Sequence, residues 1–151
     1  MAEFVYNPVQ VVQPGQNVLL NGSIPCNRGN IIHREGSGIV TLRGAANNSC
    51  ARFARYQVEF NGNIAVPTDG TVGAIAVALA IDGESVQTSK AIVTPAAVEE
   101  YFNVTSTAIV TVPVGCCYTI SIENVSEGAT AADAATAINV QNANLVVSRI
   151  A

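Results

Sequence analysis

Residues 107–126 (TAIVTVPVGCCYTISIENVS) constrain the fold most, because apolar and polar positions alternate along them. In the first half, Val110 and Val112 are expected on one face and Ile109 on the other. In the second half, alternate residues from Cys116 to Ile122 are expected on one face, and those from Cys117 to Glu123 on the other. Period-two alternation is typical of a strand that buries one face and exposes the other. Pro113 has no N–H to donate to a ladder, so we predict two strands that are joined at residues 113–115.

Similar units recur along the 151 residues, a length that is typical of one domain. Val, Ile and Thr dominate between Gly, Asn and Pro, and this composition favours an all-β protein. Only 12% of the residues are charged, against a usual share of about 25%. So low a charge indicates that copies of the chain cover one another. No apolar run approaches the roughly 18 residues of a membrane span, so no membrane partner is expected.

Residues 73–83 (GAIAVALAIDG) predict a strand with two apolar faces. One face carries Ile75, Val77, Leu79 and Ile81, whereas the other carries only alanine. The outer face of a sandwich strand is usually in contact with water, but an alanine strip allows close approach by another subunit. We therefore predict a trimer interface at Ala74, Ala76, Ala78 and Ala80.

Turn-forming residues divide the remainder of the chain. Asn61-Gly62 and Asp82-Gly83 predict hairpins. Thr94-Pro95, followed by two glutamates, predicts a single helical turn at 95–100. Strands are expected between the turns, at 31–35, 38–44, 54–63 and, as a closing pair, 138–150. In the strand at 54–63, Tyr56, Val58 and Phe60 are expected on the inner face.

Residues 1–20 are predicted to form an extended N-terminal arm, and residues 21–151 the β domain. Pro8 and Pro14 exclude a helix in this segment, and its Val and Leu residues give it strand character. Two alternatives are equally favoured: the arm crosses to a neighbouring subunit, or it is the first strand of its own subunit.

At least eight short strands with turn signals every 8–12 residues predict a β-sandwich or barrel. Three patterns follow in order: GTVGAIAVALAIDG (70–83), VPVG before YTISIEN (112–124) and ANLVVSRI (143–150). They resemble the jelly rolls of the tumour-necrosis-factor/C1q type, and more closely the C-terminal trimeric domains of bacterial collagen-like exosporium glycoproteins. The resemblance covers about residues 54–151 and implies an antiparallel jelly-roll β-sandwich that forms homotrimers. The whole chain also resembles short stand-alone proteins of gut-bacterial phages, which implies a virion setting.

Five of the six arginines lie between positions 28 and 55, although the net charge is −4. They would hold an acidic partner surface, a phosphate or an anionic glycan, or form intersubunit salt bridges with Glu59, Glu99 or Glu100. Aromatic residues do not interleave with them as a base-stacking surface requires, so nucleic-acid binding is not expected. The predicted attachment residues are Arg28, Arg34, Arg43, Arg52 and Arg55.

No catalytic, cofactor or metal site is predicted. His33 has no partner carboxylate or nucleophile at a recognisable spacing. Cys116 and Cys117 are adjacent on a strand and face opposite ways, so they cannot both bind one ion; Cys116 is expected in the core. Reduced thiols are favoured for all four cysteines, including Cys26 and Cys50, because the N-terminus does not resemble a signal peptide.

These features favour a non-enzymatic, homotrimeric structural protein of a bacteriophage virion. It would be a head decoration, head fibre or knob, assembled in the host bacterial cytoplasm against a capsid or other virion protein. One alternative is a spore-coat, exosporium or cell-surface protein of a Gram-positive bacterium. Another is a carbohydrate-binding module with a glycan receptor, which has less support because Trp is absent and Tyr and Phe are expected to face mostly inward.

Overall fold

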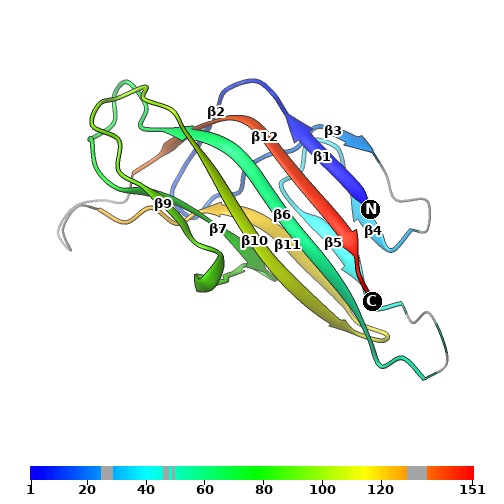
Figure 1. Cartoon of the computed structure of the whole chain (residues 1–151). Helices are drawn as coiled ribbons and strands as arrows, with labels where there is room; N and C mark the ends of the chain where they lie inside the picture. Colours follow the sequence, from blue (N-terminus) through cyan, green and yellow to red (C-terminus); the bar gives the residue numbers. More distant parts are fainter. Residues whose placement is uncertain (25–28, 46–47, 49, 129–135) are drawn as a thin grey trace.

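The computed structural model describes residues 1–24, 29–45, 48, 50–128 and 136–151, and these form two six-stranded antiparallel sheets (Figure 1). Sheet 1 has the order β10-β6-β12-β1-β3, and β2 also pairs with β12. Its strands are β1 (Ala2–Tyr6), β2 (Gln10–Val12), β3 (Gly22–Ile24), β6 (Phe53–Ala65), β10 (Phe102–Pro113) and β12 (Ile138–Arg149).

Sheet 2 has the order β4-β5-β11-β7-β8, and β9 also pairs with β7. Its strands are β4 (Ile31–His33), β5 (Val40–Arg43), β7 (Ile75–Ile81), β8 (Glu84–Ser85), β9 (Ala91–Val93) and β11 (Cys117–Asn124). A short 3₁₀ helix, η1 (Gln87–Ser89), lies between β8 and β9. The sequence prediction of an all-β jelly-roll sandwich is confirmed. No helix in the described part of the chain is long and apolar enough to span a membrane.

The inner faces of the two sheets form one hydrophobic core. Tyr56, Val58 and Phe60 alternate along β6 with exposed residues, as the sequence predicts. Leu79 on β7 and Ile120 on β11 belong to the same core cluster. This burial removes one face of each sheet from water, which supplies most of the favourable free energy of folding.

Buried polar side chains close the edges of the sandwich. The Asn124 amide donates to the carbonyls of Val12 (2.9 Å) and Thr136 (3.0 Å), so it ties β11 to the end of β2 and to the segment just before β12. The Ser89 hydroxyl accepts the N–H of Leu79 at 2.9 Å, on the edge of β7 between the residues that pair with β8 and those that pair with β9. Each contact satisfies a backbone group that would otherwise be buried without a partner.

The prediction for residues 107–126 is confirmed in its main features: β10 and β11 are joined at 114–116, where Gly115 has a φ of 84°. Val110 and Val112 are buried, and Ile109 between them is 63% exposed. The placement of Cys116 in the core is wrong, because the turn extends to this residue and leaves it outside β11. Cys50, Cys116 and Cys117 are free and exposed, and Cys26 lies outside the described residues.

Local turn signals succeed at Asp82-Gly83 and fail at Asn61-Gly62. Asp82 and Gly83 have φ values of 50° and 84° and form the tight hairpin between β7 and β8. Strand β6, in contrast, runs through Gly62 to Ala65, and β12 bulges beside it at Asn142, whose φ is 53°. A glycine inside a strand is typical of a bulge. The predicted closing strand pair is likewise one bulged strand.

The predicted helical turn at 95–100 is absent. Glu99 has a left-handed φ of 57°, and its N–H donates to the Val66 carbonyl at 2.8 Å. The Glu100 carboxylate accepts the N–H groups of Ala96 (2.7 Å) and Ala97 (3.2 Å), so it stabilises an irregular turn.

The N-terminal segment is the first strand of its own subunit, which was one of the two alternatives. β1 pairs with β12 on one side and with β3 on the other, and the three strands lie side by side in Figure 1. Phe4 is 2% exposed, and Val12, Val18 and Leu20 are also buried. Residues 1–20 therefore contribute to the core of the sandwich.

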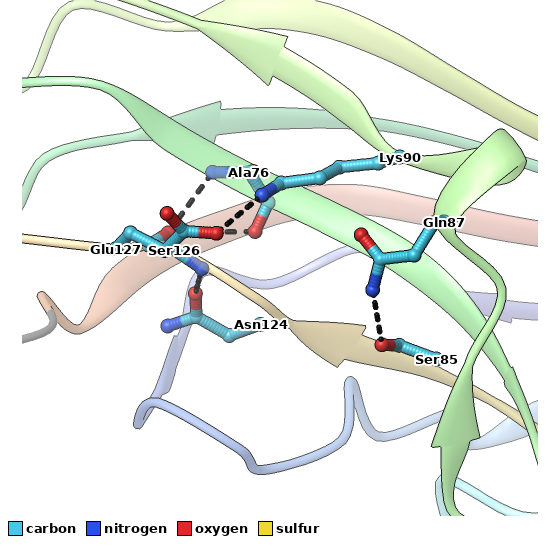
Figure 2. Close-up of polar contacts among 7 residues, drawn as sticks. All are labelled: Ala76, Ser85, Gln87, Lys90, Asn124, Ser126 and Glu127. Atoms are coloured by element: carbon cyan, nitrogen blue, oxygen red, sulfur yellow. Dashed lines mark hydrogen bonds and ion pairs between the residues drawn. The ribbon is translucent and has the colours of Figure 1, made fainter.

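The alanine strip on β7 is covered within a single chain, which corrects the expectation of an open face. Ala76, Ala78 and Ala80 are at most 3% exposed, and Ala74 is exposed. Short side chains on a sheet are shielded by longer neighbours: Ala78 lies opposite Glu123. Figure 2 shows the Lys90–Glu127 ion pair (2.8 Å) and the Ser126 hydroxyl beside Ala76. The three buried alanines therefore offer little surface to another subunit.

Candidate functional site

The outer face of sheet 1 is the candidate site, because exposed residues alternate with buried ones along its long strands. Across this face, Gln57 of β6 lies opposite Ile109 of β10, and Glu59 lies opposite Thr107. We define the outer face by the residues that point away from the core: Glu3, Val5, Phe53, Arg55, Gln57, Glu59, Asn61, Asn63, Asn103, Thr105, Thr107, Ile109, Thr111, Gln141, Asn144, Val146 and Ser148.

The centre of the outer face is polar but almost uncharged. The Asn103 amide nitrogen donates to the side-chain oxygens of Asn61 (2.7 Å) and Asn63 (3.1 Å). The Asn144 amide donates to the Glu3 carboxylate at 2.5 Å. Because these groups satisfy one another, covering them requires fewer bonds to water to be broken than an isolated set of amides would.

Apolar groups lie at opposite edges of this face. Ile109 on edge strand β10 is 63% exposed. Toward the β3 edge, a hollow of about 180 Å³ is lined by Met1, Ala2, Glu3, Ile24 and Val146. Each chain thus presents an apolar knob at one edge and an apolar hollow near the other.

The predicted attachment arginines do not form one group. Arg34 lies at the turn of the β4–β5 hairpin, and Arg43 lies at its opposite end. Arg43 is joined to the start of β6, because the Tyr56 hydroxyl donates to its carbonyl at 2.6 Å. Arg52 and Arg55 flank the start of β6. Arg28 lies outside the described residues.

Arg149, which sequence reasoning did not select, joins Arg52 and Arg55. Antiparallel pairing places it opposite Tyr56, so the end of β12 lies beside the start of β6. The sequence does not show that the strand at 143–150 pairs with the strand at 54–63, and only this pairing brings Arg149 close to the other two arginines. Within the described residues, Lys90–Glu127 is the one ion pair. Within the described part of a single chain, the arginines therefore form no salt bridge with Glu59, Glu99 or Glu100. Salt bridges between subunits stay a prediction.

A second hollow, of about 460 Å³, lies at this end of the sandwich. It is lined by Asn48, Cys50, Ala51, Arg52, Phe53, Arg149 and Ala151. The Arg55 guanidinium lies 4.6 Å from the centre of the Phe53 ring. The sequence predicts that most aromatic residues face inward. Phe53 is an exception, because it is 40% exposed.

His33 has a structural environment. Its Nε2–H donates to the Ser37 carbonyl at 2.8 Å, and its ring packs on Phe4 with the ring centres 4.7 Å apart. Among the described residues, no three His, Cys, Asp or Glu side chains gather in a way that could hold a metal ion.

Two carboxylates, one on β11 and one in the segment that follows it, have shifted pKa values. Burial raises the pKa of Glu123 on β11, and the nearby charge of Glu84 raises it further. The hydrogen bond from Lys90, with its positive charge, lowers the pKa of Glu127.

No protein-family model matches the chain, and neither does any curated protein sequence. Among solved structures, the chain is similar to the globular domain of zebrafish complement 1qA protein, with a TM-score of 0.62 at 15% identity over 99% of this chain and 97% of that one. It also matches the C-terminal domain of EclA, a sugar-binding protein, with a TM-score of only 0.37 at 13% identity over 82% and 86% of the two chains. The first likeness shows that the chain has the C1q-like jelly-roll fold.

Proposed function

We propose that this chain is a non-enzymatic structural protein of a bacteriophage particle, and that it assembles as a homotrimer through the outer face of sheet 1. The observation that carries the proposal is the pairing of an exposed apolar knob with an apolar hollow near the opposite edge of a face that has few charges. Only Glu3, Arg55 and Glu59 among the residues of this face are ionisable. A contact that covers it would desolvate few charges.

The positions of knob and hollow suit a ring of copies. Ile109 of one subunit would enter the hollow near Ile24 and Val146 of the next. Because the two features lie toward opposite edges, each subunit can use its knob on one neighbour and its hollow on the other. Such a head-to-tail contact closes into a ring when the rotation between copies fits. Burying an exposed Ile contributes about 1.5–3 kcal/mol, and three contacts would form per ring.

Three observations support the particle setting. The sequence resembles stand-alone proteins of gut-bacterial phages, its charged content of 12% fits a surface shared with other copies, and the fold matches the jelly roll that the resemblance implies. The partner on the particle would be the capsid or another virion protein. A spore-surface setting is the alternative, with the same trimer.

The assembly is tested by size-exclusion chromatography with light scattering at micromolar concentration. We expect a mass of three times 15.6 kDa. Ile109→Asp should give a folded monomer, because a buried unpaired carboxylate costs several kcal/mol. The matched control is Ile92→Asp, since Ile92 on sheet 2 is similarly exposed (59%) and should leave the trimer intact. A wild-type monomer would contradict the proposal, and a trimer that only Ile92→Asp breaks would place the interface on sheet 2.

A cross-link distinguishes a ring from a two-fold pair. Ile109→Cys and Val146→Cys are introduced together in a chain whose four native cysteines are replaced by serine. Oxidation should then produce a covalent species of three chains on a non-reducing gel. A species that stops at two chains would indicate a face-to-face dimer. The particle setting is tested separately, by mass spectrometry of purified phage particles and of purified spores from the host.

A further inference from the structure

The 460 Å³ hollow that Arg52 and Arg149 line is called the arginine hollow below, and backbone hydrogen bonds hold its walls in place. The N–H of Arg55 donates to the Ala151 carbonyl (3.0 Å), and the N–H of Val114 donates to the Arg52 carbonyl (3.0 Å). The Asn48 side chain accepts the N–H of Cys50 at 2.9 Å, and both residues line the hollow. Its volume lies within the roughly 300–1,000 Å³ of small-molecule sites.

Guanidinium groups dominate the charge of this hollow. Arg149 donates from Nε to the Ala151 carbonyl (3.1 Å) and from Nη2 to the Ala45 carbonyl, so its orientation is fixed. These two bonds use two of the five N–H donors of a guanidinium. Arg52 also lines the hollow, and no Asp or Glu side chain is among the described residues that line it. Glu59, the next acid along β6, is four residues beyond Arg55, or about 13 Å along the strand.

An aromatic surface completes the hollow. Phe53 forms part of its lining and is 40% exposed. The Arg55 guanidinium stacks on this ring, which restrains the ring and brings a third positive charge close to the hollow. The Asn48 amide nitrogen adds a donor for a hydroxyl group, because only its oxygen is used by Cys50.

We propose that this hollow binds an acidic sugar, with the carboxylate on Arg52 and Arg149 and the apolar face of the ring on Phe53. Planar guanidinium groups pair with carboxylates through two parallel hydrogen bonds, which gives the anion both strength and orientation. An inorganic anion would leave the Phe53 ring unused, and a neutral sugar would leave the guanidinium groups unpaired. The combination therefore selects a ligand that carries both features.

The proposal is tested by titrating the ¹⁵N-labelled full chain with sugars and following amide chemical shifts by NMR. The probes are N-acetylneuraminate and D-glucuronate, with N-acetylglucosamine, D-glucose and inorganic phosphate as comparisons. We expect saturable shifts at the amides of residues 48–53 and 149–151 with an acidic sugar. Shifts that are absent there, phosphate that binds as tightly as the acidic sugars, or neutral sugars that bind equally well would each overturn the proposal.

Variants separate a specific site from general charge. Arg52→Gln should weaken binding about tenfold or more, because a hydrogen bond to a charged group is lost. Arg34→Gln removes the same charge at the other end of the β4–β5 hairpin, and it should leave affinity unchanged; equal weakening by both variants would refute a localised site. The titration is repeated on the Ile109→Asp chain, whose hollow is intact. If the Ile109→Asp chain binds the acidic sugar, sugar binding does not depend on whether the trimer forms.

Discussion

Replacing Phe4 by alanine tests whether the N-terminal segment is part of the fold. Phe4 is 2% exposed and belongs to the hydrophobic core, and its ring packs on His33 at 4.7 Å. Truncating a buried Phe typically costs about 3–5 kcal/mol, which includes the lost transfer free energy and the cavity left behind. Since β1 is held between two other strands, it cannot collapse easily into that cavity, and we expect a loss of about 4 kcal/mol.

Urea denaturation followed by circular dichroism measures this loss. With a slope of about 2 kcal/mol per molar urea, the midpoint should fall by about 2 M. Wild type and variant must be compared at the same protein concentration, because assembly makes apparent stability depend on concentration. Val5→Thr, on the opposite face of the same strand, is the matched control and should cost less than about 1 kcal/mol.

The reasoning would be refuted if Phe4→Ala shifted the midpoint no more than Val5→Thr does. That result would mean that residues 2–6 are not docked on their own sheet, and it would favour the alternative of an arm that crosses to another subunit. The same logic predicts that deleting residues 2–20 destabilises the whole domain, because it removes β1, β2 and several core side chains.

Three further predictions concern sheet 2. Ile120→Ala should cost about 2–5 kcal/mol in urea denaturation and Thr119→Ala less than about 1, because Ile120 is 1% exposed and Thr119 lies on the other face. Gly83→Ala should lower thermal stability by about 1–2 kcal/mol, since nothing crowds the site and the φ of 84° alone opposes a side chain. Glu123→Gln should raise the melting temperature at pH 7 and have little effect well below pH 4. Burial and the charge of Glu84 raise the pKa of Glu123 in the folded protein, so the ionised carboxylate opposes folding above that pKa. The penalty disappears at low pH, because the carboxyl group is then protonated in both the folded and the unfolded state. A Glu123→Gln protein no more stable than wild type at pH 7 would contradict this.

The alternation of side chains along single strands could be predicted from the sequence, because it depends on the strand alone. Val110, Val112 and Ile120 are buried and Ile109 is exposed, as expected. The Asp82-Gly83 hairpin could also be predicted, because its two positive φ values need only these residues.

Features that depend on neighbouring strands could not be predicted. Asn61-Gly62 has the sequence of a hairpin, but β6 pairs with β10 and β12 on its two sides through this point, and the ladder overrides the local preference. The burial of Ala78 depends on the side chains that flank it in sheet 2, which the sequence does not identify. Arg149 was missed for the same reason, since only the pairing of β12 with β6 brings it to Arg52 and Arg55.

The two proposed sites share a boundary, and this affects how the protein would function. Phe53 and Arg55 belong to the outer face of sheet 1, and Phe53 also lines the arginine hollow. A closed ring formed through this face would therefore carry three hollows at the same end of the assembly. A single sugar bound by two guanidinium groups and one ring has modest affinity, but three sites that engage one glycan-coated surface together can gain 10²–10⁴-fold in avidity. If both proposals hold, Ile109→Asp should leave binding of a free acidic sugar unchanged but strongly reduce binding to a surface densely coated with it, and Arg52→Gln should weaken both.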